Sequence, residues 1–337
     1  TFLAFIFSTL AAFLRERTDF VYHSSKEIVE ELKLPFLGHI PYMDSFANLR
    51  SEKDTLFKNT DEVSLESKGD NSDNSGYKLF FYQEALRNLY TSIRFLNSDV
   101  ENKVISITSC LPSEGKSLVN CLLAKSIAEL DKKVLLIDCD LRKAQVHKRL
   151  ALNNVIGLSN LITDSKLEID EVIQKVNRVP NLDVITAGQK PPDPSKILTS
   201  NRMKDLMIQL KEKFNYDLII FDTTPVLGLA DSSFISEYCD GMILLISVAK
   251  VSRDLPKQAV KRLKNSGSNL LGVITNSVNG KYKESNNTGY GYYSYSDYAE
   301  YADNNNSVDE QQSQQENTRV RKFFILPLLK ILEWLDK

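Results

Sequence analysis

The chain has 337 residues, with 42 Lys and Arg against 44 Asp and Glu, so its formal net charge is −2. A charge balance of this kind lacks the basic footprint of nucleic-acid-binding proteins, and no nucleic acid partner is expected. The four cysteines show neither C-x-x-C spacing nor neighbouring histidines, which is typical of reduced thiols in a cytosolic domain.

The first segment of the chain is apolar. Residues 1–14 contain no charge and are followed at once by Arg15, Glu16 and Arg17. The run is shorter than the roughly 20 residues of a membrane-spanning helix, and it lacks the leading basic region of a signal peptide. We interpret 1–17 as the end of a truncated transmembrane helix whose arginines mark the cytoplasmic side. The alternative is a short amphipathic or buried helix of a soluble protein.

The next segment, 18–50, is interpreted as juxtamembrane. A short helix is predicted over 26–32, with Ser24 or Ser25 as its N-cap, and the stretch 34–41 follows it. This segment is expected to form a small element between the membrane and the following domain.

A polar, acidic stretch then covers 51–78. It has few large apolar side chains, which is typical of a flexible linker. The linker would allow the domain predicted over 79–280 to swing below the membrane. A helix is expected near the start of that domain, over 83–94, where Glu84 and Arg87 can pair across one turn.

Apolar runs with strand character alternate with helical patterns through the rest of this domain. Strands are expected at 104–108, 135–138, 182–186, 218–221, 242–248 and 271–275. Helices are expected at 118–130, 200–213 and 253–264. Such alternation predicts an α/β fold with a mainly parallel, doubly wound sheet, helices on both faces, and a nucleotide at the carboxyl ends of the strands.

The connection between the first strand and the helix at 118–130 carries the residues P-S-E-G-K-S at 112–117. A strand, a short loop with G-K-S and a helix are the context that a phosphate-binding P-loop requires. The full pattern G-x-x-x-x-G-K-[ST] is met only in its second half, because Cys110 stands where the first glycine is expected.

We expect this loop to bind a nucleoside triphosphate. Its backbone N–H groups and the positive end of the helix dipole would hold the phosphates, Lys116 would reach the β- and γ-oxygens, and the Ser117 hydroxyl would bind Mg²⁺. The residues predicted to bind the nucleotide are Ser113, Glu114, Gly115, Lys116, Ser117 and Leu118.

Three aspartates stand at the ends of two predicted strands. Asp138 and Asp140 follow one strand, and Asp222 follows another. Because Mg²⁺ takes one or two carboxylates besides phosphate oxygens, we expect Ser117, Asp138 and Asp222 to form the metal site. The catalytic residues are predicted to be Lys116, Asp138 and Asp140, with one carboxylate of the pair accepting a proton from the attacking hydroxyl. The alternative, above all for Asp140, is a helix or turn cap.

The segment 281–318 begins with a tyrosine cluster and has the composition of a disordered tail. Half of the 14 tyrosines of the chain fall between Lys281 and Ala302, among Gly, Ser and Asn. The alternative to a functional tail is a low-complexity segment with some tendency to self-associate. The cluster consists of Tyr282, Tyr290, Tyr292, Tyr293, Tyr295, Tyr298 and Tyr301.

The last segment, 319–337, combines basic residues with Phe, Leu and Trp. It is predicted to form a helix that lies on the inner membrane surface. Docking of this helix against the protein or a partner is the alternative.

These motifs together resemble the cytoplasmic kinase module of the bacterial protein-tyrosine kinases that regulate capsular and exopolysaccharide assembly. The shared features are the P-loop, D-x-D-x-R at 138–142, D-x-x-P at 222–225 and the tyrosine-rich tail, in the same order. The stretch P-P-D-P-S at 191–195 also matches. The resemblance covers about residues 80–301 in detail and extends more loosely to the N-terminus.

The resemblance implies a P-loop fold of the deviant Walker A superfamily and an ATP- and Mg²⁺-dependent tyrosine kinase. It implies that the tail tyrosines are phosphorylated in trans within a ring of identical subunits, and that their phosphorylation regulates polysaccharide polymerisation and export. It also implies a bacterial inner-membrane protein with a cytoplasmic kinase domain, partnered by the polysaccharide export machinery. The apolar N-terminal helix would then be the second of two and follow a periplasmic domain.

The chain departs from the family pattern in the E-x-x-R-x-x-R oligomerisation helix. The final arginine position of that helix is occupied by Tyr90, which puts the ring contact in doubt. The pair Glu84 and Arg87 is then either an intrahelical pair or an interface contact. Arg142 and Asp231 lie near the ends of motifs. Arg142 is expected to contact the phosphates or another subunit, or to form a surface salt bridge.

The strongest enzyme competitor is the related class of partitioning and septum-positioning ATPases. Those proteins carry a lysine four residues before the glycine of the G-K pair, and that position is Leu111 in this chain. The difference favours the kinase interpretation. The alternative function is therefore a deviant Walker A ATPase that acts as a nucleotide-switched assembly scaffold of the export machinery, without kinase activity.

Overall fold

The computed structural model of the chain describes residues 20–42, 72–96, 102–177 and 179–277. The chain divides into two compact units, 1–284 and 285–337, and the second lies wholly outside the described residues. The predicted membrane-helix end, most of the predicted linker, the tyrosine cluster and the predicted C-terminal helix lie outside them as well. Among the helices described, none has the length and apolarity needed to cross a membrane.

One sheet organises the described residues, and it confirms the predicted mainly parallel α/β architecture. Its eight strands follow the order β1-β8-β7-β2-β6-β3-β5-β4, and within the described residues only the β4–β5 pair is antiparallel. The strands are β1 (Phe36–Ile40), β2 (Val104–Ser109), β3 (Val134–Asp138), β4 (Ile173–Lys175), β5 (Leu182–Ile185), β6 (Leu218–Asp222), β7 (Gly241–Val248) and β8 (Leu270–Ser277).

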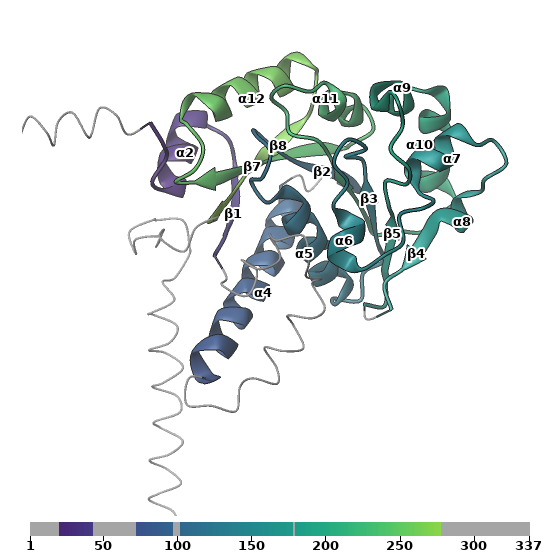
Figure 1. Ribbon diagram of the computed structural model, residues 1–337. Helices are drawn as coiled ribbons and strands as arrows, with labels where there is room; N and C mark the ends of the chain where they lie inside the picture. The colour runs from purple at the N-terminus through teal and green to yellow at the C-terminus, as the bar shows by residue number, and fades with distance from the viewer. Residues whose placement is uncertain (1–19, 43–71, 97–101, 178, 278–337) are drawn as a thin grey trace, which may run out of the picture. The chain divides into compact units, whose positions relative to one another are not determined.

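Helices cover both faces of this sheet, as Figure 1 shows. Helices α4, α5 and α6 lie on one side, and α2, α9, α11 and α12 lie on the other. The helices are α2 (Ser25–Leu32), α4 (Ser72–Phe95), α5 (Lys116–Ala128), α6 (Val146–Leu150), α7 (Leu158–Thr163), α8 (Ile169–Val172), α9 (Pro194–Leu198), α10 (Asn201–Glu212), α11 (Asp231–Ser236) and α12 (Asp254–Asn265).

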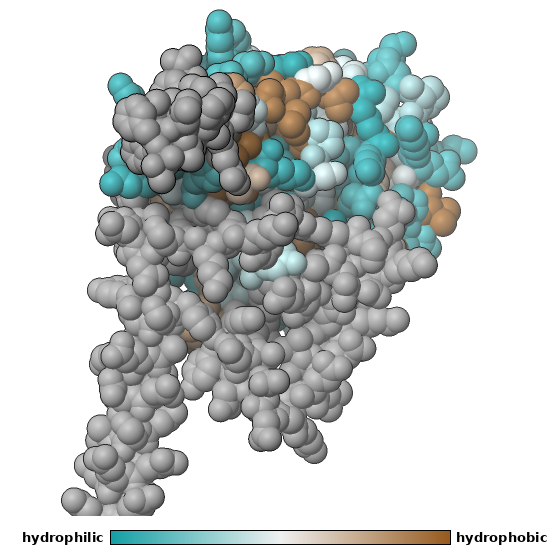
Figure 2. All heavy atoms as spheres, turned by 60° about the vertical axis from the view of Figure 1, so that its left-hand side comes forward, coloured by the Kyte–Doolittle hydropathy of each residue, from teal (hydrophilic) through white to brown (hydrophobic). Residues whose placement is uncertain are grey.

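The central strands β2, β3, β6 and β7 are buried along their whole length because both of their faces are covered. In β3, Leu136 joins the core under α4 and α5, whereas its neighbours Leu135 and Ile137 join the core on the opposite face. All five residues of this strand are buried. The described surface that Figure 2 shows is mostly hydrophilic, with apolar side chains in small groups.

The six strands and the short helix α2 that the sequence predicted are present, within a residue or two of their expected bounds. The Ser24 hydroxyl caps α2 by accepting the backbone N–H of Glu27 at 3.2 Å. The first helix of the domain is longer than predicted. It begins at Ser72, inside the segment 51–78 that was interpreted as a linker.

The segment 34–41 differs from its prediction as a small separate element, because it contributes a strand to the main sheet. Strand β1 pairs with β8 in parallel, and the Val273 N–H donates to the Pro35 carbonyl at 2.9 Å. The backbones of β1 and β8 approach closely here because Gly272 has no side chain. A Cβ built on Gly272 would lie 2.4 Å from the Pro35 carbonyl oxygen and 3.0 Å from Leu37 Cγ.

We therefore predict that Gly272→Ala separates β1 from β8 and lowers the free energy of unfolding by about 1–3 kcal/mol. Urea denaturation measures this loss, and hydrogen exchange should show reduced protection of the β1 amides. Gln258→Ala, on the exposed side of α12, is the control and should leave both unchanged. Equal stability and protection in Gly272→Ala and the wild type would contradict the close contact.

Candidate functional site

The P-loop connects β2 to α5 at the carboxyl ends of the parallel strands. Gly115 is the N-cap of α5, with φ at +98°, and Ser113 also has a positive φ, +65°. A side chain at φ values of this kind is strained, so the loop must be held by its surroundings. Helix α5 starts at Lys116, which places the amino end of the helix beside the strand ends that carry the aspartates.

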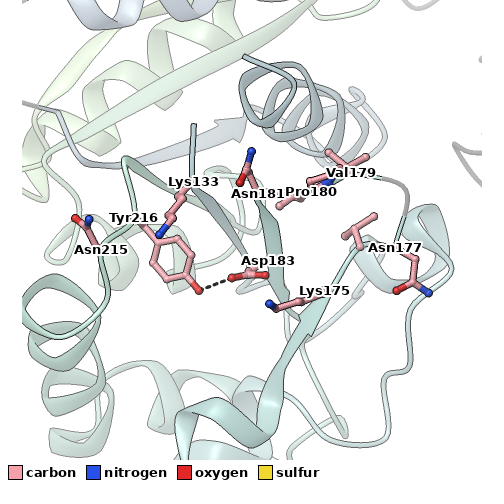
Figure 3. Close-up of a pocket in the computed structure, with 11 residues that line it drawn as sticks. Lys133, Lys175, Asn177, Val179, Pro180, Asn181, Asp183, Asn215 and Tyr216 are labelled. Atoms are coloured by element: carbon pink, nitrogen blue, oxygen red, sulfur yellow. Dashed lines mark hydrogen bonds between the residues drawn. The ribbon is translucent and has the colours of Figure 1, made fainter. Parts of the chain in front are cut away.

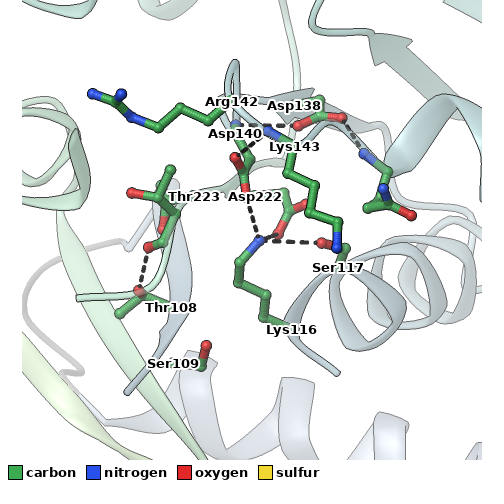
Figure 4. Close-up of polar contacts among 12 residues, drawn as sticks. Thr108, Ser109, Lys116, Ser117, Asp138, Asp140, Arg142, Lys143, Asp222 and Thr223 are labelled. Atoms are coloured by element: carbon green, nitrogen blue, oxygen red, sulfur yellow. Dashed lines mark hydrogen bonds and ion pairs between the residues drawn. The ribbon is translucent and has the colours of Figure 1, made fainter. Parts of the chain in front are cut away.

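Lys116 is the centre of the site, as Figure 4 shows. Its Nζ lies 3.0 Å from Asp140 Oδ2, 3.6 Å from Asp222 Oδ1 and 3.3 Å from Ser117 Oγ. Burial alone would lower the pKa of this ammonium, but the carboxylates of Asp222 and Asp140 raise it above its ordinary value. Lys116 is therefore a charged group that already faces the acidic side chains predicted from the sequence.

Asp222 ends β6, directly beside the end of β3. Its Cα is the sheet partner of Asp138, so the two side chains point to the same face. Asp222 Oδ1 accepts a hydrogen bond from Asn120 Nδ2 at 2.8 Å, while Oδ2 is buried without a hydrogen-bond partner. Asn120 was not predicted. Its only sequence signal is a polar residue one turn after Lys116 in an otherwise apolar helix.

Asp138 is completely buried, and its carboxylate accepts three backbone N–H groups. Oδ1 accepts from Asp140 at 3.1 Å, and Oδ2 accepts from Gln145 at 3.2 Å and from Val146 at 3.1 Å. Burial, together with the nearby carboxylates of Asp222 and Asp140, raises the pKa of Asp138 well above its ordinary value. The aspartate that braces the start of α6 is thus Asp138.

Asp140 combines a structural contact with a place in the site. Its Oδ1 accepts the backbone N–H of Lys143 at 2.9 Å, and its Oδ2 pairs with Lys116. The turn contact that was the alternative for Asp140 is therefore present, alongside the ion pair with the P-loop lysine.

The oxygen ligands predicted for a metal fit Mg²⁺ in their chemistry. Ser117 and Asp222 offer hard oxygen atoms, and Asp222 Oδ2 is a buried acceptor with no partner. Within the part of the chain that the structure describes, no three His, Cys, Asp or Glu side chains form a preformed metal cage. This agrees with a cation that binds through one or two protein oxygens and the phosphates of a nucleotide.

Lys116, Ser117 and Asp140 border a pocket of about 350 Å³, whereas the predicted site residues Asp138 and Asp222 are fully buried and do not line it. The pocket opens over the P-loop and toward the end of β8. The predicted residues that line it are Ser113, Gly115, Lys116, Ser117, Leu118 and Asp140. Further lining residues that the sequence did not single out are Tyr42, Tyr82, Lys143, Gln145, Arg149 and Asn276.

The side chain of Glu114 is absent from this lining and is fully buried behind the loop. Leu111 N–H and Ser247 N–H donate to its two carboxylate oxygens, at 2.5 and 3.1 Å. Burial raises the pKa of Glu114 to about 7 despite these hydrogen bonds. A direct contact between Glu114 and a nucleotide can thus involve its backbone only.

Arg142 lies at the rim of the pocket but is paired. Its Nε and Nη2 donate to the carboxylate of the buried Asp231 at 2.5 and 3.1 Å, and Nη2 also contacts Ser195 Oγ at 3.2 Å. The Ser195 hydroxyl donates to Asp231 at 2.9 Å. The salt bridge predicted as one alternative is present, and it joins the loop after β3 to α11. Ser195 joins α9 to the same pair.

In helix α4, Arg87 Nη1 and Glu84 Oε1 form an intrahelical pair at 2.5 Å. Tyr90, which occupies the position of a family arginine, is partly buried against the core between α4 and α5. The structure thus shows the intrahelical alternative for Glu84 and Arg87.

A second pocket of about 500 Å³ lies at the opposite end of the strands, as Figure 3 shows. Lys133, Lys175, Asp183 and Tyr216 are among its lining residues, and the Tyr216 hydroxyl donates to Asp183 at 2.9 Å. None of the predicted site residues lines it. The helix amino end and the strand-end aspartates therefore make the smaller pocket the candidate nucleotide site.

Comparison with known proteins agrees with this geometry. A family model described as an AAA domain matches residues 102–264. The tyrosine-protein kinase YwqD of Bacillus subtilis is 40% identical over 210 residues, which cover 62% of this chain and 85% of that protein. The tyrosine-protein kinase ptk of Acinetobacter johnsonii is 32% identical over 284 residues, covering 82% of this chain but only 36% of that protein.

Solved kinase structures have the same fold. The kinase domain of the Escherichia coli tyrosine kinase ETK matches with a TM-score of 0.63 and 29% identity, covering 80% of this chain and 99% of that domain. The tyrosine kinase domain of BceF matches with a TM-score of 0.62 and 27% identity, covering 77% of this chain and all of that domain.

The buried carboxyl of Glu114 yields a pH prediction. A carboxyl whose pKa rises on folding keeps its proton longer in the folded state, so the stability it contributes falls as pH rises from about 4.5 to about 7. We predict that Glu114→Gln does not show this loss. As pH rises over that range, its free energy of unfolding should increase by up to about 3 kcal/mol relative to that of the wild type. Urea unfolding at pH 5 and pH 8 measures the difference, and a pH-independent difference would contradict the assignment.

Proposed function

The chain belongs to the family of bacterial tyrosine-protein kinases, and we propose that it transfers the γ-phosphoryl group of ATP to tyrosines of its own C-terminal cluster. The observation that carries the proposal is the meeting of Lys116 with Asp140 and Asp222 at the amino end of α5, beside Asp138. An ammonium and several carboxylates at one helix end are the groups that phosphoryl transfer needs, because that reaction depends on positioning and charge stabilisation.

The P-loop would hold the phosphates. Backbone N–H groups of the loop and of the first turn of α5 would donate hydrogen bonds to them, as at other helix amino ends that bind phosphate. Lys116 would exchange its contacts with Asp140 and Asp222 for the β- and γ-oxygens of ATP. This exchange keeps the buried ammonium paired with negative charge, so it avoids the cost of an unpaired buried cation.

Ser117 and Asp222 would hold Mg²⁺ directly, and Asp138 would contact the ion through a water molecule. Mg²⁺ held by these residues would supply positive charge that offsets the negative charge developing during transfer. Release of the Asp222 carboxylate from Lys116 would leave it free to accept this role.

A carboxylate of the Asp138 and Asp140 pair would accept the proton of the tyrosine hydroxyl. The tyrosine oxygen forms a bond to the γ-phosphorus as the bond to the β,γ-bridging oxygen breaks, and ADP leaves. Asp140 borders the pocket, and burial with the nearby carboxylates of Asp222 and Asp140 raises the pKa of Asp138, which makes its carboxylate a stronger base. The pair thus has both access and basicity.

The substrate tyrosines would be those of the cluster from Tyr282 to Tyr301 on a neighbouring copy of the chain. Their setting among Gly, Ser and Asn supports a tethered substrate at high effective concentration. Each phosphate would add nearly two negative charges and favour separation of associated copies. Autophosphorylation in trans would thus be coupled to assembly.

The setting we propose is the cytoplasmic face of a bacterial inner membrane, with the polysaccharide export machinery as partner. The family resemblance supports it, and so does the apolar start of the chain followed by arginines. The chain spans about a third of the Acinetobacter johnsonii kinase it matches, so its activity in a complete protein belongs to the same proposal.

The test is incubation of the purified chain with Mg²⁺ and ATP, followed by mass spectrometry of the peptide 281–302. We expect several phosphotyrosines, reduced about 100-fold or more in Lys116→Met because the phosphates lose their buried cation. Turnover of ATP with an unmodified tail would contradict the kinase proposal and favour the ATPase alternative. A further preparation, with Lys116→Met chains mixed with active chains, distinguishes trans from cis transfer.

A further inference from the structure

Glu114 is the one acidic side chain of the P-loop, and it faces away from the nucleotide pocket. It is 0% exposed. Its Oε1 accepts the Leu111 N–H at 2.5 Å, and its Oε2 accepts the Ser247 N–H at 3.1 Å. The first contact closes the loop on itself, and the second ties the loop to the end of β7.

The backbone of Glu114 is held as firmly as its side chain. Its carbonyl oxygen accepts Asn276 Nδ2 at 2.7 Å and lies 3.0 Å from Ser247 Oγ. The same hydroxyl lies 2.8 Å from Asn276 Oδ1, so it donates to one of the two acceptors at a time. Strands β7 and β8 therefore both form hydrogen bonds with Glu114.

The loop needs such an anchor because of its conformation. Ser113 and Gly115, on either side of Glu114, both have positive φ. The Ser113 carbonyl is contacted by the ammonium of Lys250, and a Cβ on Gly115 would lie 3.0 Å from Asn276 Nδ2. Gly115 adopts its positive φ without strain, but Ser113 does not, and a strained backbone keeps its shape only when the surrounding contacts fix it.

The sequence explains why a side chain has this task. Cys110 replaces the first glycine of the P-loop pattern, and its buried side chain packs into the core with Met242 and Leu244. This fixes the start of the loop on the sheet, and Leu111 follows with its N–H turned to Glu114. The path from Cys110 to Lys116 is thus defined by a carboxylate that accepts a hydrogen bond at each oxygen.

We propose that Glu114 is a positioning residue that holds the P-loop amides in the arrangement that binds the triphosphate, an inference that rests on the nucleotide-binding part of the proposed function. It acts through the loop backbone and does not touch the nucleotide. A carboxylate suits the position because both of its oxygens face N–H donors. A glutamine would present one N–H group to a donor, and an aspartate would be too short to reach both.

The test uses the full chain and measures the dissociation constant of Mg²⁺-ATP by fluorescence of a labelled analogue, alongside KM for ATP and kcat for tyrosine phosphorylation. We expect Glu114→Gln and Glu114→Asp to weaken nucleotide binding about tenfold or more, because each loses a charge-assisted hydrogen bond. At saturating ATP, kcat should stay within about threefold, since Lys116 and the aspartates are unchanged. Glu129→Gln, at the exposed end of α5, is the matched control and should bind like the wild type.

Glu114→Gln also separates positioning from a simple loss of fold. It should remain folded at pH 8, as urea unfolding shows, and yet bind ATP more weakly, whereas a purely structural residue would affect affinity only through the loss of folded protein. Should Glu114→Gln fail to fold, Glu114→Asp decides the proposal by the same affinity measurement.

Two outcomes would overturn the inference, and they differ in what else they remove. Wild-type affinity in both Glu114 variants, with a wild type that binds ATP, would overturn the positioning role alone. A wild type that does not bind Mg²⁺-ATP would overturn the proposed function and the positioning role with it.

Discussion

The site depends on one buried ammonium and the carboxylates around it. Lys116 faces Asp140 and Asp222 at 3.0 and 3.6 Å, in surroundings where an unpaired charge of either sign would be costly. Parallel pairing of β3 with β6 sets Asp138 beside Asp222, and helix α5 delivers Lys116 to the same point. The charges compensate one another until phosphates enter. A triphosphate with Mg²⁺ has the charges to replace both partners at once, which explains why metal and nucleotide are expected to bind together.

The contacts around this cluster divide into two groups. Asn120 and the backbone N–H groups of 140, 145 and 146 orient the aspartates, while Ser247 and Asn276 hold the loop. The two groups come from opposite sides of the P-loop, so the phosphates would bind between a fixed acidic edge and a fixed loop. Glu114 belongs to the second group. Burial of its carboxyl lowers the stability of the folded protein, and such a cost is expected where function requires the residue.

Much of this was predictable because buried parallel strands are long apolar runs and a P-loop has a local signature. The strands ending at Asp138 and Asp222 could be recognised from their apolar residues. The clustering of the two carboxylates could be predicted because parallel strands end at the same edge of a sheet. Strand β1 could not, because it is five residues long and its partner β8 lies more than 200 residues away in the chain. Asp138 as a cap, Glu114 as an anchor and Asn276 as a loop contact also depend on donors and acceptors that only the tertiary fold brings together.

The central claim is that the Lys116 cluster exchanges its internal ion pairs for Mg²⁺ and a triphosphate. Its most direct test is calorimetric titration of ATP into the wild type and Asp222→Asn, each with Mg²⁺ and with EDTA. The account predicts that Mg²⁺ tightens ATP binding about 100-fold or more in the wild type and that Asp222→Asn loses most of this coupling. An equal Mg²⁺ effect in both proteins would contradict the claim, because Asp222 would then have no part in holding the ion.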